Sequence, residues 1–214
     1  MDLGTAIASS FSAGISMYGV IAALGIAGRL DVIDSASVLE RPWVIGVAAV
    51  LFVVELVVDK VPVADTAWDT IHTALRPAAG AMILGVAPDQ DLPLPVAIGL
   101  GAALAFTSHS AKSATRVLVN TSPEPVSNIL VSTAEDGLVA GLMALAFANP
   151  EIALAVTLVL VLVAIAVVVL AWRVAKRVGR RWRQRGFRHR RGRPPDGAAP
   201  AGSPPPSATR PPTG

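Results

Sequence analysis

The chain has 214 residues, of which 53% are hydrophobic and only 15% are charged, whereas an ordinary soluble domain carries roughly 25% charged residues. This composition does not fit a soluble domain and predicts a membrane protein. The net charge of +3 comes from the carboxyl-terminal tail, because eleven of the eighteen Lys and Arg residues lie between Arg173 and Arg193. The basic character therefore gives no indication that the protein binds nucleic acid.

Residues 1–172 are acidic, with six Lys or Arg residues against fourteen Asp or Glu residues, a balance of −8. The chain has no cysteine, which excludes disulfides, thiolate metal sites and cysteine nucleophiles. It also has no P-loop, dinucleotide-binding fingerprint or HExxH motif. These absences leave cofactors unassigned and favour a protein that is not an enzyme.

Six segments are predicted to be membrane helices, because a helix needs about 20 mainly apolar residues to cross the hydrocarbon core. In chain order they are residues 3–28, 43–58, 65–87, 96–118, 126–148 and 151–172. Prolines separate most of them. We expect an all-α transmembrane bundle of about six spans as one domain, residues 1–172. If residues 66–76 re-enter the membrane instead of crossing it, five spans and a re-entrant helix are expected.

The distribution of basic residues predicts the orientation. With six crossings, the loops near Lys60 and Arg116 lie on the same side as the basic tail, which is the cytoplasmic side. We expect a multi-pass protein of the cytoplasmic (inner or cell) membrane with both termini in the cytoplasm. The segment 173–193 is expected to bind anionic lipid headgroups, at about 1 kcal/mol per basic residue. Residues 194–214 hold eight of the seventeen prolines and are expected to be disordered.

Ionisable and polar residues recur at helical spacing within these segments, which places each set on one helix face. Such residues in a membrane helix normally face one another or a hydrated cavity. We therefore expect them to line a central polar cavity, with acidic residues of the first half facing basic residues of the second, for example Asp69 facing Lys112. The candidate binding residues are Glu55, Asp59, Asp65, Asp69, His72, Arg76, His109, Lys112, Arg116, Asn128, Ser132, Glu135 and Asp136.

Three functions fit this pattern. The first is a small transporter, channel or lipid-handling protein with an unknown small-molecule, ion or lipid ligand. The second is a structural or assembly protein in which buried charges only fix helix register. The third is a membrane enzyme that acts on lipids, for which no catalytic residue can be named. Asp65, Asp69 and His72 have a spacing that a divalent ion could use, but packing histidines are favoured and no metal site is assigned. Gly137-x-x-x-Gly141 is a helix-contact motif and leaves a homo-oligomer open.

Several polar strings resemble a known family. They are Asp59-Lys-Val-Pro62, Asp65-Thr-Ala-Trp-Asp69-Thr-Ile-His72, Arg76-Pro-Ala-Ala-Gly80, Ser108-His-Ser-Ala-Lys112, Ser122-Pro-Glu-Pro-Val-Ser-Asn128 and Glu135-Asp136. Together, over residues 10–172, they are similar to the bacterial membrane family named domain of unknown function 4126. The resemblance implies a multi-pass membrane protein and supplies no substrate. Ser16 stands where an Asn is expected in the family's opening motif, so Ser16 is not among the candidates.

Overall fold

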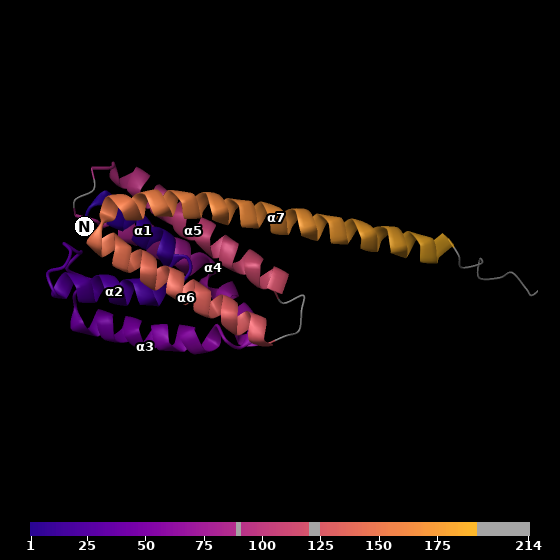
Figure 1. Cartoon of the computed structure of the whole chain (residues 1–214), viewed down its shortest axis with the longest axis horizontal. Coiled ribbons are helices and arrows are strands. Elements are labelled where there is room, and N and C mark those ends of the chain that lie inside the picture. Colours follow the sequence, from indigo (N-terminus) through magenta and orange to yellow (C-terminus); the bar gives the residue numbers. More distant parts are fainter. Residues whose placement is uncertain (89–90, 120–124, 192–214) are drawn as a thin grey trace, which may run out of the picture. The chain divides into compact units, whose positions relative to one another are not determined.

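A computed structural model of the chain contains only helices among the residues it describes, which are 1–88, 91–119 and 125–191. The side chains of 62, 63, 65, 66, 117, 118, 125, 126, 128 and 178–191 are outside this description. The prediction of an all-α protein is confirmed. The helices are α1 (Leu3–Ala13), α2 (Met17–Arg29), α3 (Pro42–Val58), α4 (Pro62–Gly85), α5 (Leu94–Val119), α6 (Pro125–Ala148) and α7 (Pro150–Arg191) (Figure 1).

The structure divides into two units, Met1–Trp172 and Arg173–Gly214, and the first contains α1 to α6 and the start of α7. Three helical segments in the described part of the chain are long and apolar enough to cross a membrane: Leu94–Arg116, Ile129–Ala148 and Pro150–Arg177. Helices α2 and α3 are apolar but shorter. Large apolar side chains such as Val50 and Leu162 are about two-thirds exposed, as expected for surfaces that face lipid. A membrane protein is therefore supported.

The first predicted span is not one helix. The segment 3–28 is broken at Gly14–Ser16 into α1 and α2, and Ser16 has an extended backbone. At 1.5 Å per residue these helices are about 17 and 20 Å long, which is less than the roughly 30 Å of a bilayer core. A Cβ on Gly14 would lie 2.0 Å from the Ser108 hydroxyl and 2.1 Å from the Ala105 carbonyl oxygen. Helix α5 thus passes directly against the break.

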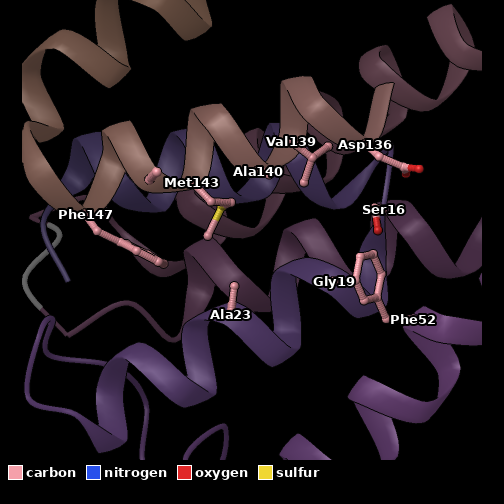
Figure 2. Close-up of a pocket in the computed structure, with 10 residues that line it drawn as sticks. Ser16, Gly19, Ala23, Phe52, Asp136, Val139, Ala140, Met143 and Phe147 are labelled. Carbon is pink, nitrogen blue, oxygen red and sulfur yellow. The ribbon is translucent and has the colours of Figure 1, made fainter. Parts of the chain in front are cut away.

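Helices α1 and α2 form an antiparallel hairpin. Thr5, in the first turn of α1, donates to the carbonyl of Ala146 near the end of α6. Ser16, at the tip of the hairpin, lines a pocket together with Asp136, ten residues earlier in α6. Ala23 of α2 lines the same pocket nearer Phe147 (Figure 2). The chain therefore enters the bundle, turns inside it and returns to the end at which it entered.

The third predicted helix also differs from the structure. Helix α4 begins at Pro62, three residues before the expected cap Asp65, and runs without interruption through Pro77 to Gly85. Residues 66–76 are therefore part of one 24-residue helix and not a separate re-entrant piece. The chain does turn back within the bundle, but it does so at the α1–α2 hairpin.

Glycine controls how closely the central helices approach. A Cβ on Gly101 of α5 would lie 2.2 Å from the Gly80 carbonyl oxygen of α4, and Ser10 of α1 donates to that same carbonyl. Helices α4 and α5 therefore meet backbone to backbone at this level, and α1 joins them through the Ser10 hydroxyl. By contrast, a Cβ on Gly137 or Gly141 would meet no atom within 4 Å in the described part of the chain. The glycines of the predicted contact motif of α6 therefore have open space beside them in the described part of the chain.

Candidate functional site

Arg76 lies at the centre of the buried polar residues and has no solvent exposure. Its guanidinium donates to Glu55 of α3 at 2.9 Å and to the Gly14 carbonyl at 3.2 Å, and it forms an ion pair with Asp69 at 3.1 Å. Glu55 and Ala48 are the two buried residues in α3, so this apolar helix contributes a single inward carboxylate. The charge of Arg76 is therefore compensated from α3 and from its own helix.

The hydrogen bond from Arg76 also determines which nitrogen of the His109 ring carries the proton. Arginine can only donate, so the 3.0 Å contact from Arg76 to His109 Nδ1 makes that nitrogen an acceptor. The proton of the neutral ring is then on Nε2, which lies 3.3 Å from the Thr73 hydroxyl. Thr73 in turn donates to the backbone carbonyl of Asp69. His109 is thus a neutral link between two turns of α4.

At the break, the carboxyl end of α1 contacts cations and the amino end of α2 contacts an anion. Helix α1 ends with carbonyls that no further turn can satisfy, and those of Gly14 and Ile15 accept from Arg76 and Lys112. At the start of α2, the Ser16 hydroxyl donates to Glu55 at 2.8 Å. Cations at a helix carboxyl end and an anion at a helix amino end are the stable pairing for helix dipoles. The break therefore belongs to the charged network.

A second group of charges continues from Lys112 along α5. Lys112 contacts Asp59 at 2.5 Å, and Arg116 donates to the Asp59 backbone carbonyl at 3.0 Å. Arg116 also donates to Glu135 of α6 at 2.9 Å. Asp59, Lys112 and Arg116 are each at most 3% exposed. This group ties the end of α3 to α5 and α6.

His72 faces an aromatic neighbourhood. Its Nδ1 lies 2.8 Å from the Trp68 carbonyl, which can only accept, so Nδ1 donates. In the neutral ring Nε2 then accepts from the Tyr18 hydroxyl at 3.0 Å. The Trp68 and His72 rings stack with centroids 4.4 Å apart. Within the described residues, no group of three or more His, Asp or Glu side chains could hold a metal ion. His72 contacts α2 in this arrangement.

A pocket of about 350 Å³ lies between α2, α3 and α6. Figure 2 shows Ser16 and Asp136 at one end and Phe147 at the other. The wall between them is apolar, with Phe52 of α3 and Met143 of α6 among its residues. Ser16 joins this pocket to the charged network, because its hydroxyl contacts Glu55. The pocket can accept a molecule with one polar end and an apolar body.

A family model described as Domain of unknown function (DUF4126) matches residues 3–170. The chain belongs to this family. The match covers α1 through α6 and α7 as far as residue 170, and so includes every contact described above. No curated protein and no solved structure matches the chain.

The sequence predicts that the candidate residues of this DUF4126 chain line a central polar cavity. In the structure most of them lie together and bond directly to one another. The largest connected set joins the two groups of charges through the hairpin tip. Its predicted members are Glu55, Asp59, Asp69, Arg76, His109, Lys112, Arg116 and Glu135. Lys112 contacts Asp59, while Asp69 contacts Arg76, so the expected facing of Asp69 and Lys112 is replaced by two other pairs.

The remaining predicted residues have separate positions. Asp136 lies 3.7 Å from Lys60 and lines the α2–α6 pocket. Ser132 is fully buried, and its hydroxyl has no hydrogen-bond partner in the described part of the chain. The side chains of Asp65 and Asn128 lie outside the described residues.

Sequence reasoning missed the residue that joins pocket and network. Ser16 departs from the family's opening motif and is not among the predicted site residues, yet it contacts Glu55 and lines the pocket. The available signal was the Gly14-Ile15-Ser16 string, where a glycine and a serine together weaken a helix. That signal is weak by itself, since membrane helices often contain both residues.

Proposed function

We propose that this protein handles lipid-like molecules: it takes an amphipathic molecule from the bilayer into the pocket between α2 and α6. The observation that carries the proposal is the pocket's lining, which is apolar along α6 and polar only at Ser16 and Asp136. Its volume of about 350 Å³ is within the roughly 300–1,000 Å³ of small-molecule sites. An apolar chain would lie along Met143 and Phe147, with its polar group at Asp136.

The proposal includes a topology of five crossings, α3 to α7, with α1 and α2 as a re-entrant hairpin. The lengths of α1 and α2 support this count, because neither helix matches the thickness of a bilayer core. Charges in α4 are compatible with a crossing, since Asp69 and Arg76 are paired inside the bundle. The count replaces the six crossings expected from sequence.

Five crossings put the two ends of the membrane domain on opposite sides. The basic segment 173–193 favours the cytoplasm for the carboxyl-terminal end, where it would lie against anionic headgroups. Asp2 and the loop between α2 and α3 would then be on the outer side. Asp59, Lys112 and Arg116 would lie toward the cytoplasmic side of the bundle.

A second candidate is transport of the bound molecule. It is favoured by two half-length helices that end inside the bundle against Glu55 and Arg76, an arrangement typical of transporter binding sites. The buried ion pairs would then hold one conformation and exchange partners in another. If they only fix helix register, the protein is a structural or assembly protein and the pocket stays empty.

The test of the primary proposal is retention of lipid-like molecules by the full chain, measured by native mass spectrometry after purification in a mild detergent. Ala140→Trp introduces a large ring into the pocket wall and should abolish retention. Ala134→Trp is the matched control, because it places the same ring on an exposed position of α6. Equal retention by both variants, or none by the parent protein, would reject the lipid-binding function.

A further inference from the structure

A second cavity lies at the end of the bundle that contains the amino terminus. It has a volume of about 570 Å³, and its lining includes Asp2 of the amino-terminal segment and Asn149 and Glu151 at the junction of α6 and α7. The ionisable residues of this lining are both acidic. We refer to this cavity as the vestibule. Its other lining residues are apolar, Leu3 and Ile152 among them, so the part of the cavity next to Asp2 and Glu151 is the part that favours water and positive charge.

Helix α1 leads from the vestibule into the bundle through a row of hydroxyl groups. Thr5 lies next to the vestibule, because its Oγ1 is 3.5 Å from the Asp2 carboxylate and donates to Ala146 of α6 at 2.9 Å. Ser9 and Ser12 follow at four and seven residues after Thr5, which places all three on one face of α1. All three residues have no solvent exposure.

The hydroxyls of Ser9 and Ser12 have no hydrogen-bond partner among the residues that the structure describes. Leaving a buried hydroxyl unpaired costs about 1–3 kcal/mol, and serine in a helix can usually avoid this by bonding the carbonyl four residues earlier. Ser10, on another face of α1, is paired with the Gly80 carbonyl. The unpaired serines are therefore the ones that continue the line from Thr5.

Helix α6, which contacts α1, also contains a buried serine with an unpaired hydroxyl, farther from the vestibule. Ser132 of α6 is fully buried with an unpaired hydroxyl in the described part of the chain. It is on the same face of α6 as Ala146, fourteen residues later, to which Thr5 donates. Glu135, one turn from Ser132, contacts Arg116. The row of hydroxyls thus points from the vestibule toward the second group of charges.

We propose that Thr5, Ser9 and Ser12 line a narrow hydrated path along the α1–α6 contact. Through it, water and protons from the vestibule reach the buried ion pairs of Asp59 and Glu135. Neighbouring hydroxyls on one helix face are about 5–6 Å apart, a gap that one bridging water can fill. The path does not depend on a ligand in the α2–α6 pocket, because none of its three residues lines that pocket.

The test uses the absence of cysteine in the native chain. Ser9→Cys and Ser12→Cys place a thiol on the path, and Ser10→Cys places an equally buried thiol on the face that contacts Gly80. The full chain in lipid nanodiscs is exposed to Ag⁺, a small hydrated cation that binds thiols, and the reaction is followed by intact mass. We expect both path thiols to react about tenfold faster than the control, which corresponds to a barrier lower by about 1.4 kcal/mol.

A second variant tests whether Ag⁺ reaches the Ser9 thiol along the path from the vestibule or because the thiol itself is exposed. Thr5→Val keeps the shape of the side chain and removes the hydroxyl between the vestibule and Ser9. Combined with Ser9→Cys, it should slow the Ag⁺ reaction about tenfold. Equal rates for the Ser9, Ser12 and Ser10 thiols would overturn the proposal, and so would a Ser9 thiol whose rate is unchanged by Thr5→Val. Thermal unfolding of each variant verifies that the bundle is folded. If one of the two path variants does not fold, the other is enough for the comparison with Ser10→Cys.

Discussion

Arg76 of α4 and Glu55 of α3 form a 2.9 Å ion pair with side-chain exposures of 0% and 2%. Glu55 is also the acceptor for Ser16 at the hairpin tip. One carboxylate therefore joins three helices, and it helps to hold α3 to the bundle together with the contacts of Asp59.

Removal of the Glu55 charge should strongly destabilise the bundle. Breaking a buried ion pair leaves an uncompensated charge and costs about 3–5 kcal/mol. Glu55→Ala should therefore lower the thermal unfolding midpoint in detergent far more than Lys60→Ala. Lys60 is 39% exposed and lies 3.7 Å from Asp136, and an exposed pair of this kind contributes about 0–1 kcal/mol. Similar midpoints for the two variants would show that Glu55 is not a structural link.

A double-mutant cycle should separate the pairing found in the structure from the pairing expected from sequence. Asp59→Asn and Lys112→Met remove two groups in contact, so their free-energy changes should differ from additivity by about 0.5–3 kcal/mol. Asp69→Asn with Lys112→Met removes groups that have different partners and should be closer to additive. The measurement is chemical unfolding of the four variants in each cycle. Strong coupling of Asp69 to Lys112 alone would contradict the described network.

A methyl group at Gly14 should disturb the hairpin. Gly14→Ala would place a Cβ 2.1 Å from the Ala105 carbonyl oxygen, and overpacking of this kind costs about 1–3 kcal/mol. Gly99→Ala in α5 is the control, because a Cβ there meets no atom within 4 Å in the described residues. In mid-helix that control should be neutral or stabilising by about 0.5–1 kcal/mol. Unfolding midpoints that fall equally for both variants would contradict a tight approach at Gly14.

Cysteine labelling should distinguish five crossings from six. Asp2→Cys, Asp34→Cys and Lys60→Cys introduce single thiols into a chain without native cysteine. An impermeant reagent applied to intact cells should label the first two and not the third, because a re-entrant hairpin returns the chain to the side of Asp2. Labelling of Asp34→Cys alone would support six crossings and reject the re-entrant hairpin.

The sequence alone determines that the chain forms membrane helices and which family it belongs to. Long apolar segments predict membrane helices because lipid cannot satisfy backbone hydrogen bonds, and α5, α6 and α7 meet that criterion. The spacing of Asp69 and Arg76 on one helix face predicts that they turn inward together, because a charge facing lipid is costly. The polar strings also predict the family, which the match over residues 3–170 confirms.

The tertiary structure decided the break in the first segment and the choice of ion-pair partners. The apolar stretch 3–28 predicts one span, because the local helix propensity around Gly14 and Ser16 is compatible with a continuous helix. Contacts from residues distant in sequence stabilise the broken form, since Arg76 and Lys112 satisfy the carbonyls that the break exposes. Likewise, helical periodicity fixes which face of α5 carries Lys112, but only the tertiary arrangement that brings the end of α3 within reach of that side chain determines that its partner is Asp59.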